Sequence, residues 1–430
     1  MVKLLSYAAA LALTSACLDE PAFAPRHLPA AEARALGVVV DERVPLGALK
    51  FPIRPSLVLD DAGRPQVFVT LWRDGADIAG FMRRDADGWR HVEVVRGPSA
   101  GVGFGGGLAY GHLDRGADGA LEVWIWRDAD GATAHDNRTD VLVSDGDAWR
   151  VVDSVPDVEV HQVVRDADRE IVALLAHYGG NGYVVEPTVG DAPWRATLFP
   201  LTTYRPVGVL TPEGTIAALA RLELTHFEGP REPIAPGADA ELHPLGPALG
   251  PNGQLHVLRQ RPLPLGHRLT LSTRARRDVW SHALVAAEPE VPSVASCPAE
   301  LGRPCAFETT RTTAAGLVVL PSGEPLWLGA RQPIEVAYQR QCLTFEPDYQ
   351  GCAMPPCADE GGPAGPWLAS PAVTPTGPAT LVVGGAPLPA EVPPTFQPAL
   401  GLDETGDLHV AWLEQDALRY LRIELPTTAP

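Results

Sequence analysis

Pairs of aromatic and cationic residues recur along this chain of 430 residues. Trp and Tyr rings stack on sugars and peptides, and a neighbouring Arg or His adds a hydrogen-bond donor or a cation–π contact. If such residues meet at one end of the fold, they form a pocket for a glycan or a peptide. The alternative is that the rings pack in the core and each Arg pairs with a nearby Asp. The candidate binding residues are Trp72, Arg73, Trp126, Arg127, His177, Tyr178, His226 and Arg331.

Two Asp-x-Asp-Gly stretches indicate a different chemistry, the binding of a hard cation. They place Asp85 and Asp87, and then Asp128 and Asp130, directly before a glycine. Calcium takes six or more oxygen ligands from loops that bend. Asp and Gly are also ordinary turn residues, which is the competing interpretation. We expect no cofactor, and calcium is the one metal ion that these four residues predict.

The sequence contains no motif that indicates a catalytic site. Residues 97–101 match the Gly-x-Ser-x-Gly pattern of hydrolases, but that pattern needs a strand, a sharp turn and a helix. Glycine-rich residues 103–107 follow instead, and no HExxH motif occurs anywhere. The formal net charge of −19 argues against nucleic acid as a partner, because its phosphates must be neutralised by cations.

The first residues have the pattern of an export signal. Lys3 precedes an apolar run over residues 4–13, and small residues follow. A positive start, an apolar stretch of about ten residues and small residues before a cut are typical of a signal peptide. The run is shorter than the roughly 20 residues that a membrane-spanning helix needs.

Ser15-Ala16-Cys17 resembles the lipobox of bacterial lipoproteins. The resemblance implies that residues 1–16 are removed and that Cys17 is lipidated, so the protein is anchored in a membrane and faces the periplasm or the cell surface. Residues 17–36, rich in Ala and Pro, then serve as a tether. Thr14 departs from the lipobox pattern, which leaves secretion without a lipid as the alternative.

The other cysteines lie together between residues 297 and 357. An exported chain meets oxidising conditions, so we expect one or two disulfides there. The expected pairs are Cys297 with Cys305 and two of the remaining three, with one thiol left over. Zinc binding is disfavoured because no Cys-x-x-Cys occurs. The five residues are Cys297, Cys305, Cys342, Cys352 and Cys357.

A short pattern occurs seven times: an apolar strand, a polar turn that usually ends in glycine, and a second apolar strand. The turn residues are Gly63, Gly119, Arg169, Gly214, Gly253, Gly323 and Gly406. In four copies the fourth residue after the glycine is Val, preceded by a polar residue. These pairs are Gln66-Val67, Glu122-Val123, His256-Val257 and His409-Val410. Each copy predicts a β-hairpin in which glycine supplies the positive φ of a tight turn.

A Trp often follows about 25–30 residues after the turn, inside a second hairpin. These residues are Trp89, Trp149, Trp194 and Trp280, and Trp367 follows its turn at a longer distance. Each unit therefore has four antiparallel strands at a spacing of about 40–55 residues, which is typical of a β-propeller blade.

We predict an all-β protein with a single closed propeller of seven four-stranded blades over residues 37–426. The last unit ends after three strands, so a strand containing residues 38–40 is expected to complete it and remove an open edge. The fourth unit lacks its Trp, which leaves six blades with an irregular segment as the alternative. Two long gaps between turns predict a cysteine-bearing insertion at about 290–365 and a Pro-rich insertion at about 371–398.

The mature chain resembles exported bacterial β-propeller proteins of a loosely sialidase-like kind. The resemblance is architectural: the sialidase Asp-box is absent, and no catalytic residue can be carried over. We expect a non-enzymatic, surface-anchored monomer that binds a protein or glycan partner in the bacterial envelope. The alternative is an extracytoplasmic glycoside hydrolase or lyase, which fold analogy alone supports.

Overall fold

The computed structural model describes residues 36–47, 49, 55–98, 107–128, 137–145, 148–178, 181–188, 194–199, 207–220, 223–227, 229, 231–234, 243–262, 267–287, 305–338, 341–342, 367–368, 372–393 and 396–425. Within these residues the regular elements are all β-strands. In this part of the chain, no helix has the length and apolar character that crossing a membrane requires.

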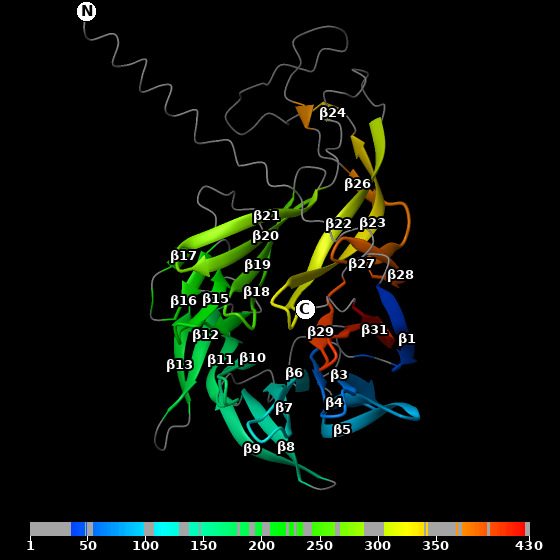
Figure 1. Cartoon of the computed structure of the whole chain (residues 1–430). Helices are drawn as coiled ribbons and strands as arrows, with labels where there is room; N and C mark the ends of the chain where they lie inside the picture. Colours follow the sequence, from blue (N-terminus) through cyan, green and yellow to red (C-terminus); the bar gives the residue numbers. More distant parts are fainter. Residues whose placement is uncertain are drawn as a thin grey trace, which may run out of the picture.

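The strands form seven antiparallel blades arranged in a ring (Figure 1). Blade 1 contains β2 (Leu57–Leu59), β3 (Pro65–Arg73), β4 (Ala76–Asp85) and β5 (Gly88–Pro98), and blade 2 contains β6 (Gly107–Arg115), β7 (Leu121–Asp128), β8 (Arg138–Asp145) and β9 (Ala148–Pro156). Blade 3 contains β10 (Glu159–Arg165), β11 (Ile171–Tyr178), β12 (Asn181–Pro187) and β13 (Trp194–Phe199), and blade 4 contains β14 (Gly208–Leu210), β15 (Ile216–Ala220), β16 (Glu223–His226) and β17 (Arg231–Pro233). Blade 5 contains β18 (His243–Leu249), β19 (Leu255–Pro262), β20 (His267–Arg276) and β21 (Val279–Ala287), and blade 6 contains β22 (Cys305–Val319), β23 (Pro325–Tyr338), β27 (Ala379–Val383) and β28 (Ala386–Val392). Blade 7 contains β29 (Ala399–Leu402), β30 (Leu408–Leu413), β31 (Ala417–Glu424) and the N-terminal strand β1 (Gly37–Pro45).

The first strand of each blade lies at the centre of the ring. These strands contact one another in a closed circle that runs β2, β6, β10, β14, β18, β22, β29 and back to β2. The turns between first and second strands therefore gather at one end of the ring, which we call the turn end. The second strands finish at the opposite end, which we call the loop end.

The seven predicted turns are confirmed and share one hydrogen-bond pattern. In blade 7, the N–H of Gly406 donates to the carbonyl of Asp403, and the N–H of Asp403 donates to the carbonyl of Asp407. Each turn residue has a positive φ: Gly63 70°, Gly119 79°, Arg169 64°, Gly214 79°, Gly253 77°, Gly323 85° and Gly406 89°. This is the geometry of a type I turn closed by a left-handed residue, which favours glycine.

The recurrent valines explain the fixed register of the repeat. Val67, Val123, Val257 and Val410 are fully buried, and each packs in an apolar cluster shared with the preceding blade. In blade 3 the pairing of β10 with β11 shifts by one residue next to Arg165, so Leu174 takes the equivalent place. Both faces of every blade are thus covered by neighbours, which accounts for the nearly continuous apolar strands.

In blades 1, 3 and 5 the recurrent Trp residues connect the outer strand to the preceding blade. The indole N–H of Trp89 donates to Glu42 on β1 at 2.6 Å, and that of Trp280 donates to Glu232 on β17 at 2.8 Å. Trp194 donates to Asp153 on β9 at 3.1 Å. The predicted second hairpin is therefore confirmed in these blades, and its Trp has a structural role.

The N-terminal strand closes the ring, as predicted. β1 pairs with β31 from Gly37 opposite Glu424 to Pro45 opposite Ala417, and the two strands lie side by side in Figure 1 (blue and red). Across the seam to blade 1, Glu42 accepts two hydrogen bonds from Arg84, both at 2.9 Å. The ring of seven blades confirms the predicted fold class.

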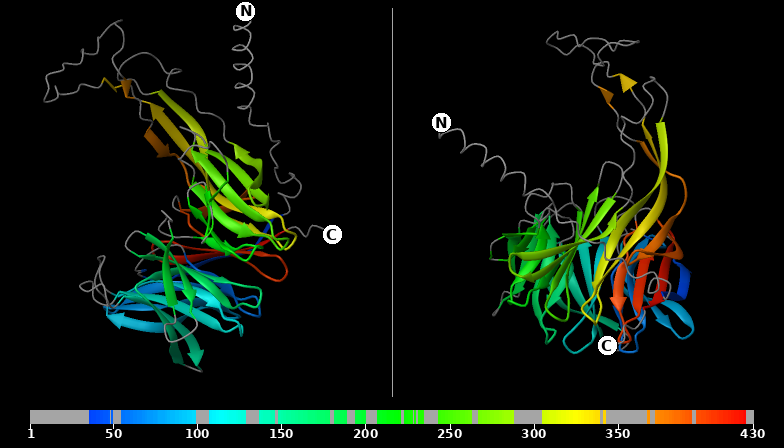
Figure 2. Two further views of the ribbon diagram at one scale, coloured as in Figure 1. Left: turned by 90° about the vertical axis from the view of Figure 1, so that its left-hand side faces the viewer. Right: turned by 45° about the horizontal axis from the view of Figure 1, so that its top comes forward.

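Blade 6 departs from the prediction in both of its expected insertions. The Pro-rich stretch is wrong as an insertion, because β27 and β28 supply the outer half of the blade. The cysteine-bearing stretch contains the two long strands β22 and β23, and β26 (Ala372–Pro375) pairs with the far part of β23. Figure 2 shows this hairpin projecting beyond the other blades. Trp367 belongs to β25 (Trp367–Leu368), which pairs with β24 (Gln341–Cys342) and not within the blade.

Several predictions fall outside the described residues. They concern the signal peptide, the lipid on Cys17 and the tether. Cys305 begins β22, but the disulfide pairing stays a prediction because Cys297, Cys352 and Cys357 lie outside the described residues.

Replacement of Glu42 by Ala tests the seam between blades 7 and 1. The change leaves the guanidinium of Arg84 and the indole N–H of Trp89 without their common acceptor. We expect a loss of about 1–2 kcal/mol in the free energy of unfolding, measured by urea denaturation. The matched control is Glu93→Ala, which breaks a similar bidentate pair with Arg96 inside one exposed strand. Equal losses in the two variants would contradict a special role for the seam.

Asp403 predicts a pH dependence of stability. Burial raises the pKa of its carboxyl, but hydrogen bonds from Thr405, His409 and the N–H of Asp407 outweigh burial and lower the pKa to about 2. A carboxyl whose pKa is lowered in the folded state stabilises the fold above its unfolded pKa of 3.8, and this contribution is lost as the pH falls towards 2. Between pH 4 and pH 2, the free energy of unfolding of the wild type should therefore fall by about 2 kcal/mol more than that of Asp403→Asn. Parallel pH profiles of the melting temperature for the two proteins would refute this assignment.

Candidate functional site

Most of the predicted binding residues reach the loop end of blades 1 to 3. Trp72 lies near the end of β3 with 48% of its surface exposed, and Arg73 beside it is also exposed. Trp126 on β7 is 8% exposed, so its ring packs in the fold. His177 on β11 is half-buried, and the side chain of Tyr178 lies outside the described part. The alternative of packed aromatics therefore holds for Trp126, whereas Trp72 is available to a ligand.

Arg127 takes part in an ion-pair cluster. It forms an ion pair with the buried Asp140, which also accepts hydrogen bonds from Arg138 at 2.8 Å and from the Ser154 hydroxyl at 2.7 Å. Two guanidinium groups thus share one carboxylate that is 1% exposed. The prediction of Arg pairing with Asp is met here, although the partner is Asp140 and not the neighbouring Asp128.

Two predicted residues do not join this group. His226 ends β16, the third strand of its blade, and therefore lies at the turn end. Its distance from the turn residue Gly214 is close to that of the end of a second strand in the earlier blades, but β15 is short and the chain has already reversed direction. His226 is buried, 3.2 Å from Glu232 and 3.3 Å from the Thr215 hydroxyl. Arg331 lies midway along β23 and is exposed, 3.4 Å from the Thr310 hydroxyl.

One of the predicted calcium ligands is surrounded by cations. Asp85 forms ion pairs with Arg83 at 3.1 Å, Arg90 at 2.5 Å and Arg64 at 3.5 Å. Three guanidinium groups around one carboxylate disfavour a calcium ion there. Asp87 is exposed in the adjoining turn, and Asp130 lies outside the described residues, so calcium at the remaining positions stays a prediction.

Two hydrogen-bond chains combine residue types that serve in catalysis elsewhere. In blade 5, the Ser272 hydroxyl lies 3.0 Å from Nδ1 of His282 and accepts a hydrogen bond from Arg259. In blade 7, His409 lies between Asp403 and the Tyr420 hydroxyl. Ser272 is fully buried and Tyr420 is 1% exposed, so neither oxygen can reach a substrate. Each of these hydrogen-bond chains connects residues of a single blade.

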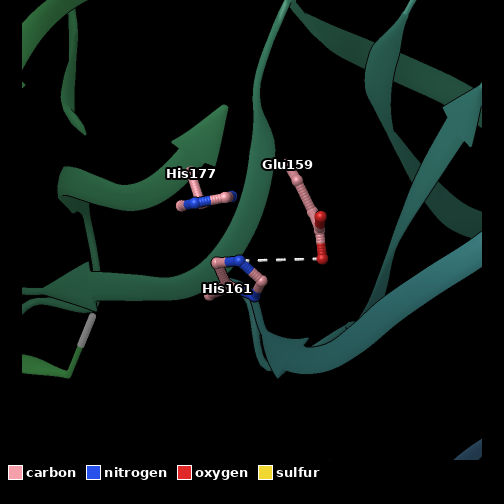
Figure 3. A group of neighbouring side chains, drawn as sticks. All are labelled: Glu159, His161 and His177. Atoms are coloured by element: carbon pink, nitrogen blue, oxygen red, sulfur yellow. Dashed lines mark ion pairs between the residues drawn. The ribbon is translucent and has the colours of Figure 1, made fainter. Parts of the chain in front are cut away.

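Glu159, His161 and His177 form the one group of side chains in the described residues whose ligand atoms converge as metal ligands do. The three atoms lie within 4.8 Å of one another (Figure 3). Nε2 of His161 lies 3.6 Å from Oε1 of Glu159, and the two imidazole rings are 6.1 Å apart. All three side chains are half-buried, and burial lowers the pKa of His177. A carboxylate and two imidazoles in this arrangement can bind a divalent metal ion or transfer protons.

The two strands place these side chains on one face of blade 3. Glu159 on β10 is directly opposite His177 on β11. Ala173 and Leu175, which share the face of His177, pack against blade 4. The pairing shifts between Val160 and Gln162, which makes His161 the extra residue of a β-bulge. His161, two residues after Glu159, lies on the same side by ordinary alternation. The bulge turns the following Gln162 to that side as well, where it bonds to the backbone of Gly208 in blade 4.

A threonine from blade 2 fixes the start of this strand. The Thr139 hydroxyl donates to the carbonyl of Val158 at 2.8 Å and accepts the N–H of Val160 at 3.2 Å. These two residues flank Glu159, and their side chains are buried against blade 2. The backbone of Glu159 is therefore held from both sides, with its side chain directed the other way.

Sequence analysis found His177 but missed Glu159 and His161. The available signal was Glu-Val-His at the start of a predicted first strand, where residues two apart share a face. The bulge and the pairing of Glu159 with His177, however, are properties of the folded blade. Nothing in the spacing along the chain distinguishes these residues from other polar residues near strand ends.

No protein family model and no curated protein matches the chain. Its fold is similar to that of virginiamycin B lyase from Staphylococcus aureus, with 10% identity and a TM-score of 0.41 over 89% of this chain and 99% of the lyase. It is also similar to an α-L-arabinanase from Penicillium chrysogenum in complex with arabinobiose, with 13% identity and a TM-score of 0.35 over 91% and 100% of the two chains. A third structure, the Dos1 propeller, has 9% identity and a TM-score of 0.41 over 91% of this chain and 96% of its own.

Substitution of Thr139 tests how blade 2 holds the cluster. Thr139→Val keeps the shape but removes both hydrogen bonds, so two buried backbone groups lose their partner. We expect a loss of about 1–3 kcal/mol in the free energy of unfolding. Thr139→Ser retains the hydroxyl and should keep most of that stability. A Val variant as stable as the wild type in urea denaturation would show that the hydroxyl does not hold the strand.

Proposed function

We propose that this protein is a non-enzymatic propeller, anchored at the bacterial surface through a lipid on Cys17, that binds a protein or glycan partner of the envelope at its loop end. The exposure of Trp72 is the observation that carries the proposal. Nearly half of the surface of this large aromatic side chain is in water, and among the exposed large hydrophobic residues of the described part of the chain it is the one aromatic residue. Aromatic side chains of this kind are common anchors in glycan and protein binding.

The surroundings of Trp72 fit such a role. Arg73 is exposed next to it, at a tight turn in which Asp74 and Gly75 both have positive φ. This two-residue turn holds the end of the hairpin in one conformation. A rigid aromatic side chain beside a cation binds a partner with little loss of side-chain entropy.

The second candidate is the extracytoplasmic glycoside hydrolase or lyase. The observation in its favour is the cluster of Glu159, His161 and His177 at the same end of the ring, since carboxylates and imidazoles serve as general acids and bases. Release of reducing or unsaturated sugars from envelope polysaccharides, lost in Glu159→Gln, would establish this function in place of the binding role.

Binding assays with Trp72→Ala test the main proposal. The purified full chain is applied to an array of bacterial envelope glycans, to isolated peptidoglycan and to solubilised envelope proteins. We expect binding to one of these probes, weakened at least tenfold by the substitution, because loss of an anchoring Trp costs about 2 kcal/mol or more. The control is Leu198→Ala, which removes another exposed apolar side chain, on the outer strand β13. Binding that is equally strong in the Trp72 variant would refute the proposed surface.

A further inference from the structure

We propose that Glu159, His161 and His177 form a binding site for one divalent transition-metal ion of the zinc class, with one coordination position left open. This inference goes beyond the proposed function and does not depend on it. The proposed metal ion differs in chemistry from the calcium ion that the Asp-x-Asp-Gly stretches predict. Its site lies in blade 3, away from those stretches.

The distances fit a zinc-type centre. Two ligand atoms about 2.1 Å from a tetrahedral ion lie about 3.4 Å apart. Nε2 of His161 and Oε1 of Glu159 are 3.6 Å apart, and all three ligand atoms lie within 4.8 Å of one another. Side-chain rotations that move the ligand atoms by about 1 Å would therefore bring all three atoms within bonding distance of one ion. In Figure 3 the ring of His177 and the carboxylate of Glu159 both lie beside the ring of His161.

The ligand types select the metal. Imidazole nitrogen suits Zn²⁺, Ni²⁺, Cu²⁺ and Co²⁺, whereas Ca²⁺ and Mg²⁺ require shells of oxygen. Two imidazoles and one carboxylate resemble, in composition, the protein ligands of zinc sites that keep a position for water or another molecule. The described residues around the cluster add no fourth His, Cys, Asp or Glu to it, which leaves that position to solvent or to a bound partner.

The backbone holds the ligands in place. Glu159 and His177 are neighbours in one strand pair, and the Thr139 hydroxyl bonds to the backbone on both sides of Glu159. The two hydrogen bonds of Gln162 to Gly208 fix β10 immediately after His161. Ligands on fixed strands lose little conformational freedom when a metal ion binds, which favours affinity.

Metal titration of the purified full chain, prepared without a polyhistidine tag, tests the site. We expect one equivalent of Zn²⁺ to bind with a dissociation constant in the micromolar range or below and to raise the melting temperature, while Ca²⁺ does neither. With Co²⁺ as a probe, a visible d–d band without a thiolate charge-transfer band is expected, which distinguishes this site from the cysteines. Glu159→Gln and His177→Ala should each weaken Zn²⁺ binding at least tenfold.

The matched control is His91→Ala, which removes a half-buried imidazole from the outer strand β5 of blade 1 and should leave Zn²⁺ affinity unchanged. Circular dichroism without metal establishes that each variant is folded. If His177→Ala does not fold, Glu159→Gln decides, because it preserves the size of the side chain. The proposal fails if the wild type binds no Zn²⁺, if Glu159→Gln binds it as tightly as the wild type, or if the Co²⁺ spectrum shows thiolate ligands.

Discussion

The structure depends on one constraint: each blade has two apolar faces, and both must be covered. Two-faced burial of this kind requires a neighbour on each side, so an open row of blades would leave its first and last faces in water. Closure of the ring satisfies every blade at once. The pairing of β1 with β31, reinforced by Glu42 against Arg84 and Trp89, provides that closure and joins blade 7 to blade 1.

The repeats were predictable because their signals are local. A turn that needs positive φ favours glycine, and the same pattern of hydrogen bonds recurs even where Arg169 takes that place. The valine four residues after the turn indicates burial between two blades. The Trp of the outer strand indicates contact with the preceding blade. The outer half of blade 6 was mistaken for an insertion because its third strand follows a long excursion of the chain and the fourth contains prolines.

The candidate site was predictable only in part. Trp72 and His177 stand at the ends of second strands, so the repeat register brings them to one end of the ring. His226 was misplaced because the strands of blade 4 are shorter than those of its neighbours. The approach of Glu159 and His161 to His177 depends on the pairing of two strands, which has no spacing signal along the chain.

The pairing of β1 with β31 also determines when the protein can reach its final form. Residues that meet at this seam, such as Arg43 and Glu414, are 371 positions apart in the chain. The ribosome makes β1 long before β31, so the seventh blade cannot assemble until β31 has been synthesised. Until then the other six blades form an open row. The outer faces of the first and the last blade in that row remain exposed to association with other chains. Contacts of such long sequence separation are characteristic of slowly folding proteins, and the seam between β1 and β31 is built from such contacts.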